Sequence, residues 1–239
     1  MRQPPLVLLA PSEGKAPGGL PGRLPESPAQ AWVRRRLATL VRSGSALDLA
    51  RAFEVKGPAL LAAKSEAAAL AGEVPLLPAL ERYIGVAYQA LDPGRLNRES
   101  WARVWVLSPL RGLERGDQQV PPYKLKLGSF PGLREHWKTH LPALLAGLPA
   151  GPLWDLLPAE HAKLLKGWER PRHTLEIRNA RGVSVSHAAK KYRGLVAGWI
   201  LRERQGDPAR VFRSRIEGCA WVGLTSNGVG GANLLLEVP

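Results

Sequence analysis

The chain has 239 residues, and 34 Lys and Arg against 20 Asp and Glu give a net charge of +14, which predicts a polyanion such as DNA as its partner. The longest apolar runs fall far short of the roughly 20 residues of a membrane span, and the start lacks a signal-peptide core, so we expect a cytoplasmic protein with no membrane partner. A single cysteine excludes an internal disulfide and a thiolate zinc site.

The first half of the sequence predicts one strand, a long loop and several helices. Apolar residues 5–10 are typical of a buried strand, and the density of Gly and Pro over 15–28 predicts a loop without regular structure. Helical spacing and helix-start residues then predict helices over 29–41, 45–53, 58–70, 76–91 and 96–102, followed by a strand over 104–107.

The second half mixes strands and helices. Residues 112–122 are polar and turn-rich, and the alternation over 123–127 predicts a half-exposed strand whose two lysines face one side. Helices are expected over 133–148, 159–168 and 186–204, and strands over 153–157, 174–177, 183–185, 216–224 and 232–238. With no regular βαβ period and no clean boundary, we predict an α+β fold in which residues 1–239 form a single mixed α/β domain.

The expected helix 186–204 has two chemically different faces. One face is an apolar stripe of Tyr192, Leu195, Val196, Trp199 and Ile200, and the other carries His187, Lys190, Lys191, Gly194, Gly198 and Arg202. Glycine inside a helix costs about 1 kcal/mol relative to alanine, so we expect something to approach closely at these two glycines. Two explanations remain open, an anion lying along the helix or a neighbouring strand beside solvated lysines.

Two further segments are candidate phosphate contacts. Val55-Lys56-Gly57-Pro58 joins two expected helices, and the backbone N–H of Gly57 can bind a DNA phosphate as helix-hairpin-helix modules do, although glycine-proline also begins ordinary helices. Ser12-Glu13-Gly14-Lys15 follows the first strand but lacks the first glycine and the Gly-Lys-Ser/Thr ending of a P-loop. It therefore predicts no ATP site of that kind, while Lys15 stays a candidate phosphate or substrate contact.

Taken together, several of these segments resemble the YaaA family of peroxide-stress proteins. The resemblance rests on the order and spacing of short motifs over nearly the whole chain. They are Pro11-Ser12-Glu13-Gly14-Lys15, Tyr83-Ile84-Gly85-Val86-Ala87-Tyr88, Val106-Leu107-Ser108 followed by Pro121-Pro122-Tyr123-Lys124-Leu125, His136-Trp137, Leu153-Trp154-Asp155-Leu156, Ser186-His187-Ala188-Ala189-Lys190-Lys191 with Arg193-Gly194, and Ile216-Glu217-Gly218 before Ser226-Asn227-Gly228.

The resemblance implies a single mixed α/β domain with a basic cleft and a helix-hairpin-helix element that binds DNA and limits oxidative damage. The family pattern places its hairpin at 54–58, its lysine pair at Lys190 and Lys191, and its proline-tyrosine strand at Pro122 and Tyr123. Where many relatives carry Ser-Gly-Leu followed by an aromatic residue, this chain has 108–111, Ser-Pro-Leu-Arg, so any role of that aromatic is in doubt here.

We therefore predict a DNA-binding protein of the hydrogen peroxide response that contacts backbone phosphates of duplex or distorted duplex with little base readout. The candidate phosphate contacts are Lys15, Lys56, Lys124, Lys126, Lys190, Lys191 and Arg193, with the backbone of Gly57 and with Tyr123 and His187 to stack or hydrogen-bond. No catalytic residue, metal or cofactor is expected. The alternative is an enzyme for a phosphorylated or nucleic-acid substrate, with Ser12, Lys15, His187 and Lys190 in one pocket.

Overall fold

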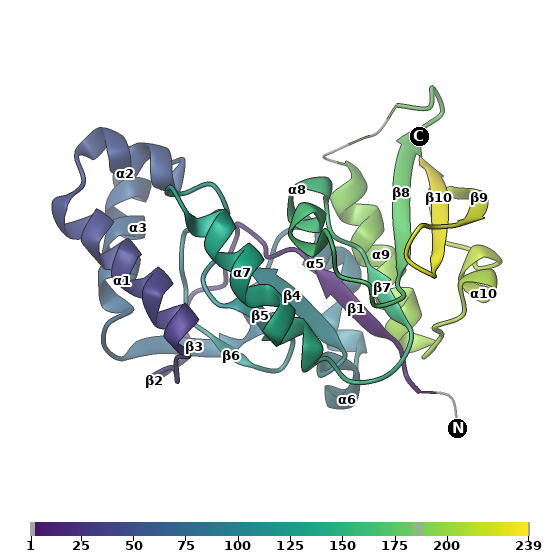
Figure 1. The fold of residues 1–239 in the computed structure, drawn as a ribbon, viewed down its shortest axis with the longest axis horizontal. Coiled ribbons are helices and arrows are strands. Elements are labelled where there is room, and N and C mark those ends of the chain that lie inside the picture. The colour runs from purple at the N-terminus through teal and green to yellow at the C-terminus, as the bar shows by residue number, and fades with distance from the viewer. Residues whose placement is uncertain (1–2, 184, 186–187, 239) are drawn as a thin grey trace.

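The computed structural model describes residues 3–183, 185 and 188–238, and its centre is a seven-stranded sheet (Figure 1). The strands are β1 (Leu6–Leu9), β4 (Val104–Ser108), β5 (Gly112–Arg115), β7 (Leu153–Asp155), β8 (His173–Asn179), β9 (Ala220–Ser226) and β10 (Ala232–Val238). Their order across the sheet is β5-β4-β1-β7-β8-β10-β9. Strand β1 therefore lies between β4 and β7.

The inner strands run parallel, whereas the edge strands β5 and β9 run antiparallel to their neighbours. β1 pairs with β4 through Val7 opposite Val104, and with β7 through Leu8 opposite Asp155. All residues of β1 are buried, as expected of a continuous apolar strand with both faces covered. The carboxyl ends of β1, β4 and β7 consequently meet at one edge of the sheet.

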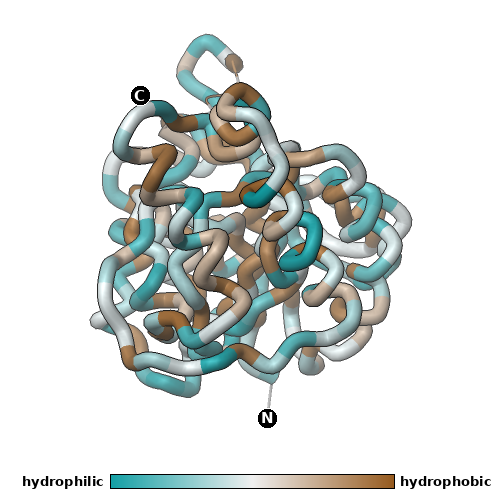
Figure 2. Tube along the Cα trace, turned by 90° about the vertical axis from the view of Figure 1, so that its left-hand side faces the viewer, coloured by the Kyte–Doolittle hydropathy of each residue, from teal (hydrophilic) through white to brown (hydrophobic). Residues whose placement is uncertain are grey.

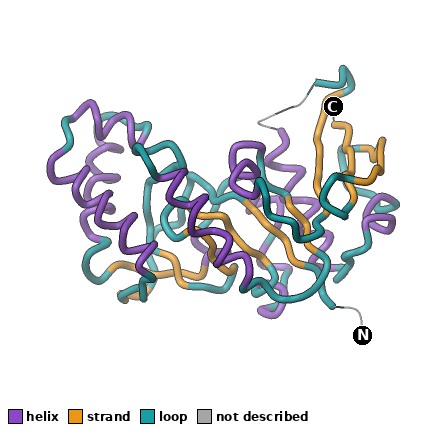
Figure 3. The backbone as a smooth tube through the Cα atoms, viewed as in Figure 1, coloured by secondary structure: helices purple, strands orange, loops and turns teal. Residues whose placement is uncertain are grey.

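Helices cover both faces of the sheet (Figures 1 and 3). In Figure 1, α7 (Leu133–Ala146) crosses in front of β4 and β5, while α5 (Val86–Leu91) and α9 (Ala188–Arg202) lie behind the sheet. The shorter elements are α4 (Ala79–Arg82), the 3-10 turn η1 (Pro93–Arg95), α6 (Arg98–Trp101), α8 (Ala159–Ala162), the 3-10 turn η2 (Lys163–Leu165) and α10 (Pro208–Phe212).

Helices α5 and α9 pack unusually closely. A side chain at Gly194 would collide with the carbonyl oxygen and carbon of Ala87, and one at Gly198 would lie 2.7 Å from the carbonyl oxygen of Leu91. Both glycines are buried. The close approach predicted at these glycines is therefore made by helix α5, rather than by an anion or a strand.

A group of helices extends to the left of the main sheet in Figure 1. It contains α1 (Pro28–Ser43), α2 (Ala46–Phe53) and α3 (Pro58–Ala69), with a small antiparallel sheet of β2 (Leu20–Gly22), β3 (Val74–Pro78) and β6 (Gln119–Val120). Ser27 and Ser45 begin α1 and α2 with reciprocal capping boxes to Gln30 and Asp48. These local signals explain why both helices begin where the sequence predicts.

The buried Arg82 holds this small sheet together. Its guanidinium donates hydrogen bonds to the carbonyl oxygens of Ala16, Gly18, Pro75 and Val120, which come from three distant parts of the chain. Charged donors make stronger hydrogen bonds than neutral ones, and each of these carbonyls would otherwise need another partner. Arg82 thus adds four hydrogen bonds to the short antiparallel pairings of β2, β3 and β6.

The expected mixed α and β domain is confirmed, but several element assignments are wrong. Residues 20–22, expected to be loop, form β2. Residues 76–78, expected to begin a helix, belong instead to β3, consistent with the helix-breaking prolines 75 and 78. Residues 112–115 form β5 rather than a turn-rich loop, because they pair with β4. Residues 123–127 form no strand, although their apolar side chains are buried and their lysines partly exposed as the alternation predicts. The strand expected at 183–185 falls partly outside the described residues.

The buried apolar side chains form one continuous cluster from β1 to β10 and into α1–α3. Figure 2 shows apolar segments gathered toward the middle of the trace and hydrophilic segments along its outer turns. Among the described residues, no helix is both long and apolar enough to cross a bilayer.

Candidate functional site

A cleft of about 740 Å³ opens at the carboxyl ends of β1, β4 and β7. We call this cavity the cleft. It is lined by Leu9, Ala10, Pro11, Ser12, Glu13, Gly14, Glu54, Gly85, Val86, Ala87, Tyr88, Pro109, Leu125, Lys126, Leu127, Gly128, Arg134, Leu156, Pro158, Glu160, His161, Lys190 and Arg193. Its residues thus come from the connections that follow three adjacent parallel strands and from four helices.

The topology of the sheet explains the position of the cleft. Between β1 and β4 the chain passes through α1–α3 and then through α5 behind the sheet, whereas between β4 and β7 it passes through α7 in front (Figure 1). Where neighbouring parallel strands send their connections to opposite faces, a crevice forms beyond their carboxyl ends, and α/β proteins bind ligands there. The cleft lies at such a point beside β1.

One side of the cleft, which we call the loop wall, consists of residues 12–14, Glu54 and 125–128. Its cation Lys126 is paired twice, at 2.9 Å from Oε1 of Glu13 and 2.6 Å from Oε2 of Glu54. Lys124 lies 3.5 Å from the same Glu13 carboxylate. The Glu54 contact raises the pKa of Lys126, and the Lys126 contact lowers the pKa of Glu13. The lysines face one side as predicted, but carboxylates already neutralise them.

A second part of the lining, which we call the helix wall, consists of Arg134, Leu156, Pro158, Glu160, His161, Lys190 and Arg193. Arg134 is bound to Glu160, with Nη2 3.3 Å from the carboxylate and Nη1 3.2 Å from the backbone oxygen. Lys190 and Arg193 are three residues apart on α9 and share one helix face. Among the described residues, neither has a carboxylate within 4.0 Å.

Two buried nitrogens of the helix wall lack protein partners. Nε of Arg193 and Nδ1 of His161 are buried and make no hydrogen bond to any residue that the structure describes. Burial, with the charge of Arg134 in addition, lowers the pKa of His161 to about 4. His161 is therefore a neutral imidazole at physiological pH, with one nitrogen able to donate and the other to accept.

Asp155 ends β7 close to the helix wall. Its Oδ2 lies 3.4 Å from Nε of Arg172, and its Oδ1 accepts a hydrogen bond from the backbone of Leu157. Burial raises its pKa, and its charge acts across space on Arg193. The carboxylate holds Arg172 and partly offsets the charge of Arg193 without binding it.

Lys15 lies on the far side of the loop wall and does not line the cleft. Its Nζ donates to the backbone oxygen of Ser12 at 3.0 Å and sits 3.9 Å from the ring centroid of Tyr123. An aromatic face attracts a cation, but it does not replace lost hydration fully. Burial accordingly lowers the pKa of Lys15 to about 8.

Behind Lys15 lies a buried polar cluster that sequence reasoning missed. The hydroxyl of Tyr83 donates to Glu114 at 2.7 Å and lies 2.8 Å from the hydroxyl of Tyr123, which lies 3.1 Å from Oγ of Ser108. Burial raises the pKa of Glu114 and of both tyrosines. Tyr123, predicted to stack on or hydrogen-bond with DNA, is instead occupied in this cluster. The cation of Arg111, the departure noted in the sequence, lies 3.9 Å from Glu114.

Comparison of the sequence with models of known protein families identifies the family of this chain. A family model described as peroxide stress protein YaaA matches residues 6–222, a stretch that runs from β1 into β9 and contains both walls of the cleft. The chain belongs to the peroxide stress protein YaaA family. The resemblance drawn from the sequence motifs is therefore confirmed.

Individual relatives of this YaaA-family chain carry the designation UPF0246. One from Corynebacterium efficiens is 32% identical over 210 residues, which cover 80% of this chain and 83% of the relative. One from Streptomyces coelicolor is 32% identical over 203 residues, covering 77% and 74%. One from Corynebacterium glutamicum is 27% identical over 207 residues, covering 80% and 83%. The similarity thus extends over most of each chain.

The predicted site residues of this YaaA-family chain fall into separate places. Lys126, Lys190 and Arg193 line the cleft, and Lys124 lies beside it, paired to Glu13. Lys191 is exposed on α9 and does not line the cleft. Lys56 and Gly57 are exposed between α2 and α3, and His187 lies outside the described residues. Of the alternative catalytic set, Ser12 and Lys190 line the cleft and Lys15 does not.

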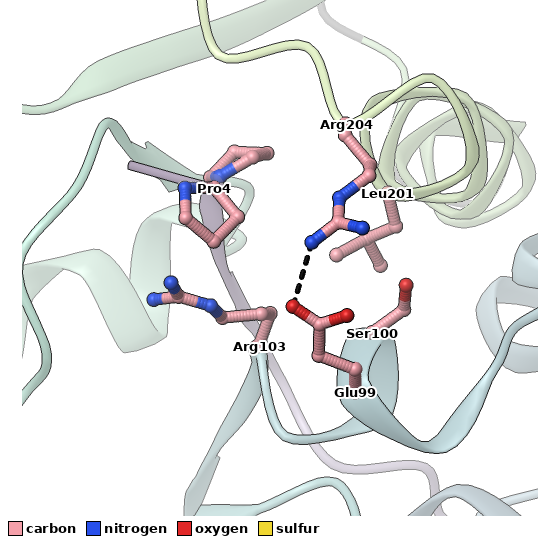
Figure 4. Close-up of a pocket in the computed structure, with 7 residues that line it drawn as sticks. Pro4, Glu99, Ser100, Arg103, Leu201 and Arg204 are labelled. Atoms are coloured by element: carbon pink, nitrogen blue, oxygen red, sulfur yellow. Dashed lines mark hydrogen bonds and ion pairs between the residues drawn. The ribbon is translucent and has the colours of Figure 1, made fainter. Parts of the chain in front are cut away.

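A second, smaller recess lies at the amino end of β1, on the opposite edge of the sheet (Figure 4). Its volume is about 10 Å³, enough for roughly one water molecule. Arg204 closes it with an ion pair of 2.6 Å to Glu99.

Among the described residues, no group of three His, Cys, Asp or Glu side chains is arranged to hold a metal ion.

Proposed function

We propose that this peroxide-stress protein binds DNA through backbone phosphates, at the helix wall of the cleft and at the connection between α2 and α3. The observation that carries the proposal is the pair Lys190 and Arg193, two cations on one face of α9 with no carboxylate partner among the described residues. They lie in the first two turns of α9, where the helix dipole favours an anion. A phosphate there has two charged donors and a favourable field.

The connection between α2 and α3 supports the proposal independently. Gly57 precedes α3 with φ of 57°, a conformation that glycine adopts without strain, and its chain is exposed next to Lys56. Pro58, the first residue of α3, has no N–H, and the N–H groups of Leu60 and Leu61 donate to the carbonyl oxygen of Gly57. The N–H groups of Gly57 and Ala59, behind the exposed cation Lys56, are therefore the ones available to a phosphate. This arrangement suits a backbone phosphate and gives no means of reading bases.

A second candidate function is an enzyme that acts on a phosphorylated or nucleic-acid substrate. One observation favours it: Ser12, which lines the cleft, accepts a hydrogen bond at its backbone oxygen from Lys15, whose pKa of about 8 leaves a substantial neutral fraction at neutral to mildly alkaline pH. Lys15 itself does not line the cleft, so this function requires it to move.

Fluorescence anisotropy with labelled duplex DNA tests the proposal at several salt concentrations. Charge reversal by Lys190→Glu is expected to weaken binding several-fold and to lower the salt slope by about one. The matched control is Arg215→Glu, which reverses one exposed cation outside the cleft. Equal losses for both variants, or no binding at low salt, would overturn the proposal. DNA recovered in altered form on a gel would favour the enzyme.

A further inference from the structure

The size of the cleft limits what can enter it. Its volume of about 740 Å³ falls within the roughly 300–1,000 Å³ of pockets that enclose small organic ligands. A DNA duplex cannot enter such a cavity, because the whole duplex is wider than its major groove, which alone is about 12 Å across. Phosphates of a duplex can touch the rim, but the interior has room only for a unit the size of a single nucleotide.

The lining of the cleft separates apolar and charged surfaces. Leu9 and Leu156 are buried at its inner end, and Val86 is 40% exposed on α5. The cations Lys190 and Arg193 lie on α9. A ligand that fills the cleft therefore needs a flat or apolar body for the first surface and an anionic group for the second.

The two unpartnered nitrogens indicate where polar groups of a ligand would lie. Nδ1 of the neutral His161 and Nε of Arg193 are buried without a hydrogen bond to any described residue. Leaving a buried polar atom without a partner is unfavourable, so a ligand that supplies the partner binds more tightly than one that does not. The edge of a nucleobase or a sugar hydroxyl offers such a partner, and a phosphate offers an acceptor for Arg193.

We propose that the cleft is a pocket for one nucleoside monophosphate unit, with its phosphate at Lys190 and Arg193 and its base on the apolar lining of β1, α5 and 156–158. The inference rests on the proposed function and deepens it. A nucleoside monophosphate unit can come from two sources. One is a free nucleotide, and the other is an unpaired nucleotide extruded from a DNA strand while the duplex is held outside the cleft.

Isothermal titration calorimetry with 2′-deoxyadenosine 5′-monophosphate tests the free-nucleotide source, with uncharged deoxyadenosine as the comparison ligand. Lys190→Glu removes the charge at the phosphate position, and Val86→Trp fills the cavity without changing charge. The matched controls are Arg215→Glu, at an exposed position outside the cleft, and Val222→Trp, at a position 49% exposed on β9. Anisotropy with intact duplex and with duplex that carries one unpaired nucleotide tests the strand source.

The expected result is that Lys190→Glu and Val86→Trp each weaken binding about tenfold, a change of about 1.4 kcal/mol, while both controls bind within twofold of the native protein. These losses in the binding of the free nucleotide would support the pocket and identify a free nucleotide as its ligand. The same losses with the duplex that carries one unpaired nucleotide, but not with intact duplex, would support the pocket and identify an extruded nucleotide as its ligand. The pocket is refuted if neither ligand responds to Val86→Trp. In that case, binding of intact duplex leaves the proposed function standing. If instead the nucleotide binds with the expected losses in both variants but no DNA binds, the proposed function alone is refuted.

Discussion

The two walls of the cleft differ in how their cations are paired. On the loop wall, Lys126 is held by Glu13 and Glu54. On the helix wall, Lys190 and Arg193 face the cleft without a carboxylate partner among the described residues. A net charge of +14 describes the chain as a whole, whereas the pairing of individual charges shows which cations of the cleft have a carboxylate partner.

The largest expected effect comes from the packing of α5 against α9, the helix that carries Lys190 and Arg193 of the helix wall. Gly194→Ala places a methyl group against the carbonyl of Ala87, and because backbone cannot yield as a side chain does, α5 and α9 must separate. We expect a loss of about 3 kcal/mol in the free energy of unfolding, measured by urea denaturation. The control is Gly228→Ala, where an added methyl group has no atom within 4 Å. Equal stability of both variants would show that the packing of α9 does not depend on this contact.

The next prediction contrasts two lysines near the loop wall, Lys15 with its pKa lowered to about 8 and Lys126 with its pKa raised. Above pH 8 the unfolded chain still binds a proton at Lys15 and the folded chain does not, so this residue makes stability rise with pH. Between pH 8 and 9.5 the rise is about 2 kcal/mol.

Lys15→Met should abolish that rise and increase the stability at pH 7. Lys126 contributes the opposite sign, but only where the pH exceeds the ordinary lysine pKa, outside this window. Urea denaturation at pH 7 to 9.5 measures the effect. If the free energy of unfolding of the native protein changed with pH as little as that of the variant, the buried position of Lys15 would be contradicted.

A smaller effect is expected from His161 on the helix wall, whose pKa is about 4. As pH falls below the ordinary histidine pKa of about 6.5, His161 binds a proton in the unfolded chain but not in the folded chain, so the free energy of unfolding falls. His161→Gln should recover about 1 kcal/mol of the loss between pH 6.5 and 5.5. His136 and His173, whose pKa values burial also lowers, retain their share of the loss. Parallel pH profiles for both proteins would contradict a buried, neutral His161.

The smallest effect tests whether pairing alone distinguishes the walls. Glu13→Gln with Glu54→Gln removes both carboxylates from Lys126 and leaves the lysines free. We expect duplex DNA to bind several-fold more tightly, with a salt slope about one larger, because each freed lysine can release a counterion from the phosphates. Asp48→Asn with Asp92→Asn, two changes outside the cleft, is the control. An unchanged slope would mean that the loop wall does not reach DNA.

Local signals in the sequence predicted the fold well wherever structure is locally determined. Ser27 and Ser45 mark the starts of α1 and α2, and the apolar run of β1 gives a strand buried on both faces. The failures are short strands stabilised from a distance. β2 and β3 contain prolines and lack a clear alternation. Arg82 binds the carbonyl of Gly18 just before β2 and that of Pro75 in β3, contacts that no local pattern encodes.

The candidate site shows the same limit. Sequence reasoning named Lys126, Lys190 and Arg193, which the fold brings to one cleft, but it could not tell that Lys126 is paired with Glu54, 72 positions away. It missed His161 because a lone histidine among ordinary neighbours gives no signal of its burial. The one usable signal was the pair of glycines in α9, which correctly indicated a close approach and left its partner open.

The four carbonyls held by Arg82 also set an order on biosynthesis. Ala16, Gly18 and Pro75 leave the ribosome before Arg82, but Val120 follows it by 38 positions. The small sheet therefore cannot close until β6 has been synthesised, by which time α1, α2 and α3 are already available to form and pack. In a nascent chain stopped before residue 120, the guanidinium of Arg82 would lack the carbonyl of Val120. The edge of β3 that pairs with β6 would then be exposed.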